Sequence, residues 1–448
     1  MQSSARSCAT THCVCSTRRV HPIDRGLLAS TRGSPVVWSG IFCDDKANTR
    51  ADRRRGMKLD IFSEIQSAQP SSEIDAAAIV QETIDQARAA DAGGFDCWWS
   101  VEHHSAAAFS ISSAPEMMLT VLAQHTDRIR LGTSGILAPF AIHHPVRIAE
   151  RAAWLDVFSG GRLELGLARS GGAEWEIFGV DAERSRAEVR ESLRMIPKMW
   201  APGSFSWNSE LIRIPEREIM PKPIQGPHPP LWLTVTGPDS CEQAGLLGVG
   251  MLGSANFSPL EHVTLAIESY EKGLAKCEAP AGSFINRQTA MFTIVHCAES
   301  RDEAIESGAA EAALWFMNEA PSVFRVAREG WLNLIRGLRG EGAASKPMLD
   351  APEPAPTDAD LNDPVPLIAL MNRQRAGQKL DPEEVFDAME PFDTCVIGDV
   401  DSCRSKLRAF EATGLDRLMC MVQFGKLAPE AALRSIEILG KQIVPEFS

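Results

Sequence analysis

The sequence predicts an α/β fold in which eight parallel strands close into a (β/α)₈ TIM barrel with insertions. Short apolar runs alternate with helical patterns along most of the chain, and eight of these runs are each paired with a helix. No Gly-x-Gly-x-x-Gly and no P-loop follow any run, which disfavours a nucleotide-binding doubly wound sheet. The 448 residues slightly exceed what a typical barrel needs, so insertions account for the excess.

The predicted strands are rich in branched aliphatic and aromatic residues, which favour buried sheet positions. They span 57–62, 95–101, 129–135, 163–167, 231–235, 249–252, 289–297 and 417–422. The helices between them show apolar residues at helical spacing, and several begin at Pro or end at Gly. They are expected over 73–93, 115–125, 145–155, 186–199, 239–246, 259–275, 301–316, 400–412 and 429–441, with a hairpin over 205–214.

Residues 1–56 do not fit this alternation. They carry a net charge of +6, against −20 for the rest of the chain, and show neither helical nor strand periodicity. Their composition resembles a transit peptide, but no amphipathic helix is evident. We expect a disordered or non-native extension here, followed by a barrel domain over 57–448. The Cys and His residues of segment 1–56 match no standard zinc spacing, so disorder is preferred to a metal site.

A second interruption precedes the last predicted strand. Residues 341–366 are rich in Pro, Ala and Asp and have no apolar period, which predicts a long loop. We expect 341–390 to form an insertion that serves as a lid over the barrel.

Composition restricts the class of partner. A net charge of −14 disfavours general nucleic-acid binding, because nothing offsets repulsion from phosphates. No stretch approaches the roughly 18–20 apolar residues of a membrane span. The cysteines after residue 56 are scattered singly, as is typical of a reducing compartment. We therefore expect a cytoplasmic protein with no nucleic-acid or membrane partner.

The second predicted strand ends in Glu102-His103-His104. Ligands of parallel α/β folds bind at the carboxyl ends of strands, and an imidazole there can exchange a proton near neutral pH. The adjacent Glu could orient it. Two neighbouring His on a strand point to opposite faces and no third ligand is apparent, so no metal is predicted. A hydrogen-bonded structural pair is the alternative, and His143-His144-Pro145 is interpreted as a structural turn.

Two further strand ends favour an anion. Arg169 follows the fourth predicted strand, and a guanidinium suits a phosphate or carboxylate. Residues 236–240 follow the fifth and open a helix, where unpaired amides attract anions, although Thr or Ser there is usually only a cap and Asp239 adds negative charge. Together they predict a phosphate-bearing cofactor. Ser134-Gly135, after the third strand, either lets a flat ring approach the backbone or forms a turn.

These residues together resemble the bacterial luciferase-like flavin monooxygenase family. The combination is specific although no single motif is, and the resemblance covers about residues 57–447. The matching segments are Gly94–His104, Ile129–Thr133, His144–Arg147, Leu155–Arg169, Pro223–Trp232 and Gln423–Gly425.

The resemblance implies reduced FMN bound at the carboxyl ends of the barrel strands, supplied by a separate flavin reductase, and a homodimer. His103 matches the catalytic imidazole that assists the oxygen chemistry of the flavin. Ser134-Gly135 matches a pair with an unusual cis peptide beneath the flavin ring, while Arg169, Gly237 and Ser240 match phosphate contacts. Thr236 lies beside these phosphate contacts. The implied cofactor-binding residues are therefore Ser134, Gly135, Arg169, Thr236, Gly237 and Ser240.

Several departures limit what the resemblance implies. Ser105 replaces an aromatic residue, and Gly237 replaces a hydroxyl residue at a phosphate contact. Ala168 stands where light-emitting members keep a reactive cysteine, so light emission is not expected. Residues 341–390 fall where the lid of the family varies, so no substrate is implied. The leading hypothesis is an FMN-dependent monooxygenase acting on a small organic substrate with O₂. The alternatives are deazaflavin-dependent hydride transfer and a non-catalytic flavin-binding protein.

Overall fold

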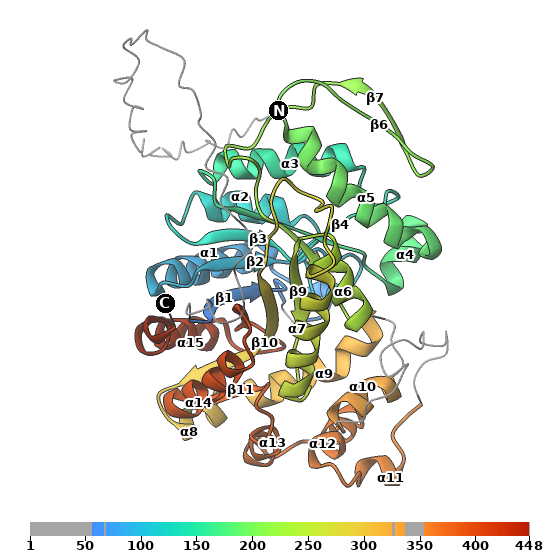
Figure 1. The fold of residues 1–448 in the computed structure, drawn as a ribbon. Helices are drawn as coiled ribbons and strands as arrows, with labels where there is room; N and C mark the ends of the chain where they lie inside the picture. The colour runs from blue at the N-terminus through green and yellow to red at the C-terminus, as the bar shows by residue number, and fades with distance from the viewer. Residues whose placement is uncertain (1–55, 67–68, 325–327, 337–353, 448) are drawn as a thin grey trace, which may run out of the picture. The chain divides into compact units, whose positions relative to one another are not determined.

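Eight parallel strands close into a barrel in the computed structural model, which describes residues 56–66, 69–324, 328–336 and 354–447 (Figure 1). Around the barrel they follow the order β1 (Lys58–Ser63), β2 (Cys97–Ser100), β3 (Arg130–Thr133), β5 (Leu163–Ala168), β8 (Leu231–Thr234), β9 (Gly250–Ser254), β10 (Thr289–Ala298) and β12 (Arg417–Met421). Because β12 pairs with β1 and β9 pairs with β10, these eight strands form a closed ring. The predicted TIM barrel and all eight predicted strands are confirmed.

Helices cover the outer face of this barrel. They are α1 (Ala76–Gly93), α2 (Pro115–Ala123), α3 (Pro145–Phe158), α5 (Ala182–Trp200), α6 (Pro238–Leu246), α7 (Leu260–Leu274), α14 (Val400–Ala412) and α15 (Pro429–Gln442). The first begins later than predicted, because the Asp75 carboxylate accepts the amides of Ala77 and Ala78 and caps it. Residues 71–73 form a separate 3₁₀ turn. The helix ends at Gly94, whose φ of 83° is left-handed.

Additional elements lie outside the eightfold repeat. The predicted hairpin is confirmed as β6 (Phe205–Asn208) and β7 (Arg213–Arg217). Two short strands were not predicted: β4 (Ile136–Leu137) pairs with β5, and β11 (Val396–Asp399) pairs with β10. None of the described helices is long and apolar enough to cross a membrane.

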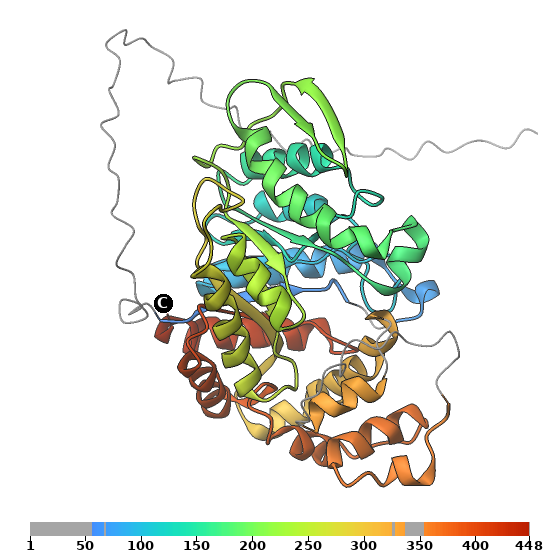
Figure 2. The same ribbon diagram turned by 45° about the vertical axis from the view of Figure 1, so that its right-hand side comes forward.

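A group of helices occupies the chain between β10 and β11 (Figures 1 and 2). It comprises α8 (Arg301–Glu306), α9 (Ala309–Phe324), α10 (Arg328–Ile335), α11 (Asp358–Leu361), α12 (Pro366–Arg375) and α13 (Pro382–Met389). The single helix predicted over 301–316 is wrong, because Gly308 adopts a φ of 73° and separates α8 from α9. The loop predicted over 341–366 is wrong at 358–361, where the Thr357 side chain caps α11. Residues 341–353, like 1–55, lie outside the described residues.

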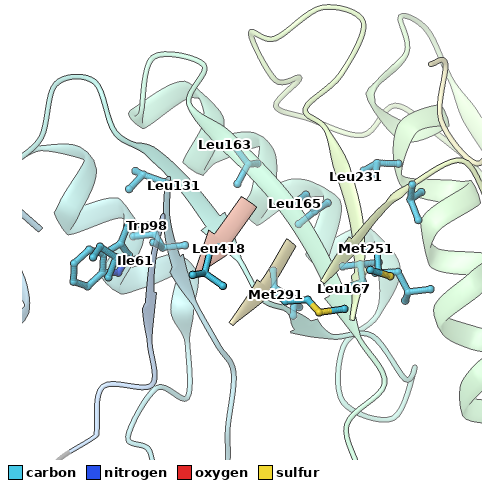
Figure 3. Packing of buried hydrophobic residues seen from close by; sticks show 14 of the residues in the cluster. Ile61, Trp98, Leu131, Leu163, Leu165, Leu167, Leu231, Met251, Met291 and Leu418 are labelled. Atoms are coloured by element: carbon cyan, nitrogen blue, oxygen red, sulfur yellow. The ribbon is translucent and has the colours of Figure 1, made fainter. Parts of the chain in front are cut away.

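The barrel strands separate two buried layers. Apolar side chains of one face, including Ile61, Trp98 and Leu165, pack beneath the helices (Figure 3). Inside the barrel, the rings of Trp99 and Trp232 meet edge to face at 5.2 Å between centroids. Gly132 and Gly250 make room for them, since a Cβ at either position would lie within 2.3 Å of a tryptophan ring. Trp98, Trp99 and Trp232 are fully buried, whereas Trp154 is 49% exposed.

Candidate active site

The predicted site residues follow four strands that are neighbours in the barrel. His103 follows β2, residues 134–135 follow β3, Arg169 follows β5 and residues 236–240 follow β8. Since parallel strands all end on the same side, barrel closure brings these positions to one end. We call this end, formed by the carboxyl ends of the barrel strands, the carboxyl rim.

Unusual backbone conformations are also concentrated at the carboxyl rim. Among the described residues, the non-glycine positions with positive φ are Ile65 (48°), Ser105 (57°), Ser170 (67°) and Phe257 (53°). Each lies within five residues of the end of a barrel strand. Such conformations cost of order 1–3 kcal/mol and persist where function or surrounding structure enforces them. The strained backbone therefore marks the same end of the barrel as the predicted residues.

The His103 ring lies between two carboxylates. Its Nδ1 is 3.0 Å from Glu174 Oε1, on α4 (Gly172–Phe178), and its Nε2 is 3.5 Å from Glu64 Oε2, directly after β1. The Ser170 hydroxyl donates to the other oxygen of Glu174. The edge of Phe109 meets the imidazole at 5.9 Å between centroids. His103 is therefore oriented by carboxylates that come from two different strand-helix units.

Burial and charge act in opposite directions on this cluster. Burial alone would lower the pKa of His103, but Glu64 and Glu174 outweigh it and hold the pKa above its ordinary value. Burial also raises the pKa of Glu64, to about 7, against the influence of His103. It would do the same for Glu174, but hydrogen bonds from His103 and Ser170 bring that pKa below its ordinary value. The arrangement favours a protonated imidazole beside an ionised Glu174.

The expectation that Glu102 orients His103 is wrong. Glu102 Oε1 lies 3.0 Å from His104 Nε2 and 2.6 Å from His143 Nε2, and its Oε2 accepts the Leu137 amide at 2.8 Å. Extended residues alternate between two faces, so Glu102 and His104 point the same way and His103 points away from them. His143 therefore has a buried carboxylate partner as well as a place in a turn. His143 and His144 are interpreted from the sequence as a structural pair. This interpretation is confirmed for His144, whose Nδ1 accepts the Val146 amide and caps α3.

Arg169 presents a cation beside the carboxyl rim. Its guanidinium lies 4.4 Å from the centroid of the Trp175 ring, while Nε donates to Ser185 Oγ at 2.8 Å and Nη2 to the Ala182 carbonyl at 3.1 Å. No ion pair links it to a carboxylate of the described residues. Burial, and then the neighbouring Arg186, lower its pKa against the opposing influence of Glu183, so a bound anion would relieve an unfavourable environment.

The start of α6 has its own internal cap. Ser240 Oγ accepts the amides of Thr236 at 3.0 Å and Gly237 at 3.1 Å, and donates to the Gly237 carbonyl at 2.7 Å. A Cβ built on Gly237 would meet no atom within 4 Å, so space is open beside this turn. Arg169 follows β5 and this turn follows β8, so the two lie near each other because β5 and β8 pair through Leu167 and Leu233. The hydroxyl is thus a helix cap in this structure, and its contact with a phosphate stays a prediction.

Residues 134–135 join β3 to β4, and the peptide bond between them is cis, as the resemblance implies. A Cβ on Gly135 would lie 2.8 Å from the Leu167 carbonyl carbon and 2.9 Å from Gly166. Glycine is required here because the chain passes directly against the β5 backbone.

Sequence reasoning missed both carboxylates that face His103. Glu64 carried a usable signal, since it directly follows the first predicted strand as Glu102 follows the second. Glu174 carried none, because it lies inside a short helix that was not predicted. Within the described residues, no group of three or more His, Cys, Asp or Glu side chains is arranged to hold a metal ion.

Comparison with known proteins adds to this geometry. The family model for luciferase-like monooxygenases matches residues 57–417. The chain belongs to the luciferase-like monooxygenase family. It is 29% identical to the oxygenase component of the flavin-dependent trigonelline monooxygenase of Acinetobacter baylyi, over 83% of this chain and 90% of that protein. As a member of this family the protein is a flavin-dependent oxidoreductase.

Several solved structures share the fold. A monooxygenase from Streptomyces bottropensis superposes with a TM-score of 0.67 at 21% identity, covering 88% of this chain and all of that one. The oxygenating component of 3,6-diketocamphane monooxygenase from Pseudomonas putida, in complex with FMN, gives 0.64 at 19%, over 88% and 99%. A coenzyme F420-dependent tetrahydromethanopterin reductase from Methanopyrus kandleri gives 0.60 at 18%, with the same coverage. One of these neighbours is thus an FMN complex and another is an F420-dependent enzyme.

Proposed function

We propose that this protein is the oxygenase component of a two-component monooxygenase. It would take reduced FMN from a separate reductase and use O₂ to oxygenate a small organic substrate. The observation that carries the proposal is that one carboxyl rim presents both His103, held between two carboxylates, and the cation of Arg169, which forms no ion pair within 4.0 Å among the described residues. The similarity to a trigonelline monooxygenase component supports both the reductase and the use of O₂.

The residues present fit the phosphate of FMN. Arg169 supplies positive charge, and the first turn of α6 supplies amides at the positive end of its dipole. Gly171 and Gly237 both border open space, since a Cβ on either would meet no atom within 4 Å. Arg169 and the α6 turn would hold the phosphate, while residues 134–135 would lie against the ring. When bound, reduced FMN would supply the reactivity toward O₂.

His103 would hold and deliver a proton in this reaction. Its two ring nitrogens face carboxylates at 3.0 and 3.5 Å, which fix the ring plane and favour the charged form. Apolar side chains beside it would exclude water, because Phe109 stacks on Phe316 of α9 at 5.2 Å between centroids. The helices α12 and α13 pack against α9 (Figure 2). We propose on this basis that the described part of the insertion predicted over 341–390, residues 354–390, covers the substrate site of a single barrel domain over 57–448.

An anaerobic titration with reduced FMN, followed by O₂ and a substrate panel, tests the proposal. The panel contains aldehydes, ketones, alkanes and trigonelline, which is chosen from the similarity to the Acinetobacter baylyi protein. We expect saturable binding of reduced FMN and product formation coupled to O₂ uptake. Substrate-dependent reduction of a deazaflavin without O₂ would instead establish hydride transfer. Tight FMN binding without any product would indicate a non-catalytic flavoprotein.

We further propose that two copies associate through α2 and α3. Trp154 and Phe158 stack on α3 at 5.6 Å and are each 49% exposed, and Met117 and Val121 of the adjoining α2 are 70% and 39% exposed. Light scattering should show a dimer for the wild type and a monomer for Trp154→Glu. Leu265→Glu, at another exposed apolar position, is the matched control and should stay dimeric.

A cytoplasmic location is proposed from the scattered single cysteines, and the seven in the described residues are all free. Fractionation of the native host with antibody detection tests this location.

A further inference from the structure

Glu64 is a buried carboxylate that the proposed mechanism uses only as a neighbour of His103. Its side chain is 2% exposed, and its Oε2 lies 3.5 Å from His103 Nε2. That oxygen accepts no hydrogen bond from any described residue. Leaving a buried polar atom without a hydrogen bond is energetically unfavourable, so the position calls for a physical reason.

The chain holds Glu64 in place with several long-range contacts. The Ser110 hydroxyl donates to its carbonyl at 2.6 Å, and Gln66 joins the Phe109 carbonyl to the amide of Gly425. Between them, Ile65 adopts a φ of 48°, which is costly for a β-branched residue. The fold therefore fixes the carboxylate against the imidazole despite an unpaired oxygen and a strained neighbour.

Three other buried carboxylates of this barrel accept hydrogen bonds at both oxygens, although Glu311 Oε2 on α9 also accepts none from the described residues. Glu102 contacts two imidazoles and a backbone amide, and Glu164 accepts from Arg130 and Trp232. Both oxygens of Asp156 accept hydrogen bonds from residues 224–225. A purely structural role would lead us to expect the same for Glu64. Its incomplete hydrogen bonding, together with its position against the His103 ring, distinguishes Glu64 from these three carboxylates.

We propose that Glu64 stores a proton for His103, so that the pair can change its charge distribution inside the closed site without solvent. In this step the N–H bond at His103 Nε2 breaks and an O–H bond forms at Glu64 Oε2, leaving a neutral imidazole and a neutral carboxyl. Glu174 keeps its hydrogen bond to Nδ1 and holds the ring in place. Glu64 acts through His103 and is a positioning residue. The proposal deepens the proposed function and rests on it for the identity of the reaction.

The surrounding charges support this assignment. Three carboxylates influence the His103 ring, with Glu64 at Nε2, Glu174 at Nδ1 and Glu102 farther away. Burial raises the pKa of Glu64 to about 7, whereas the pKa of Glu174 is held below its ordinary value by its hydrogen bonds. Two carboxylates whose environments move their pKa values apart in this way commonly have different roles in a site. Glu64 is thus the group able to exchange a proton near neutral pH.

Titration of His103 by NMR in the flavin-free full-length protein tests the proposal. The sample carries ¹³C in its histidine rings, and a His103→Gln spectrum assigns the signal. In the wild type we expect a midpoint above about 6.5, the ordinary value for histidine. Glu64→Gln should lower that midpoint by about one unit, and Glu176→Gln, a matched change on the exposed face of α4, should leave it unchanged. An identical midpoint in Glu64→Gln would overturn the proposal.

A second readout separates this role from a structural one. The rate at which O₂ reoxidises bound reduced FMN should have an alkaline limb that moves to lower pH in Glu64→Gln, with the affinity for FMN unchanged. Glu64→Asp should partly restore the wild-type profile. If reduced FMN fails to bind, the proposed function falls but the NMR titration still decides the role of Glu64. Should Glu64→Gln not fold, a wild-type midpoint below about 6.5 overturns the proposal by itself.

Discussion

Strand β1 and the residue that follows it carry two buried carboxylates, Asp60 and Glu64, in very different surroundings. Asp60 lies inside the barrel, where Arg417 Nη1 donates to its two oxygens at 3.1 and 3.2 Å and Trp99 Nε1 donates at 2.8 Å. Glu64 lies at the carboxyl rim beside His103, with one oxygen unbonded. Burial raises the pKa of both, to about 6 for Asp60 and about 7 for Glu64.

The difference separates a charge that supports the fold from one available for chemistry. Arg417 also donates to Asp96 and is 1% exposed, so it links β12 to the neighbouring β1 and to the residue that precedes β2 through a closed ionic network. Such a network has no unused hydrogen-bonding capacity to offer a ligand. The pair at the carboxyl rim is incomplete, and perturbed, incompletely paired groups in a ligand-binding position are typical of functional sites.

Removing Arg417 should give the largest effect on stability. Arg417→Met leaves Asp60 buried without its cation, and breaking a buried ion pair costs about 3–5 kcal/mol. We expect urea unfolding to show a loss of that size in the free energy of unfolding. Arg434→Met, which removes a 53% exposed guanidinium from a surface pair, should cost less than about 1 kcal/mol. Equal losses in the two variants would contradict a structural role for the interior network.

Replacing His103 should instead affect activity far more than folding. His103→Gln retains a polar side chain of similar size but cannot carry a proton, and general acid–base catalysis contributes about 10²–10⁴-fold. We expect a loss of this size in product formation coupled to O₂ uptake, with the free energy of unfolding changed by no more than about 1 kcal/mol. Turnover within about twofold of the wild type would remove His103 from the mechanism.

Arg169 should control affinity for the phosphate of the cofactor. A hydrogen bond to a charged group contributes about 1.5–3 kcal/mol, so Arg169→Met should weaken FMN binding by about 10–150-fold. Riboflavin lacks the phosphate, and its affinity should not change. Fluorescence titration with both flavins measures the difference. A parallel loss of riboflavin binding would show that Arg169 shapes the pocket and does not act on the phosphate.

The smallest effect concerns the pH dependence of stability at Asp60. Because its pKa is raised from 3.8 to about 6, the native state holds this proton more tightly than the unfolded chain. The resulting stabilisation is complete below about pH 4 and is lost as the pH rises through about 6. The free energy of unfolding of the wild type, relative to Asp60→Asn, should therefore fall by on the order of 2 kcal/mol from pH 4 to pH 7. A pH-independent difference would contradict the raised pKa.

The sequence alone determined the repeating architecture and one half of the site. Strand and helix patterns are local, so alternation, the eight strands and the strand-end positions of His103 and Arg169 could be predicted from neighbouring residues. The prediction of helix boundaries was wrong where a cap or a left-handed glycine competed with the apolar pattern, as at Asp75 and Gly308.

Only the tertiary structure decided which groups face one another. Glu174 lies 71 residues from His103 in the chain, and Arg417 lies 357 residues from Asp60. These contacts depend on barrel closure, which no local pattern encodes. The adjacent Glu102 pointed to other histidines because alternate residues of an extended chain face opposite ways. The imidazole was therefore predictable from the sequence, whereas the carboxylates that set its charge were fixed by packing between distant strands.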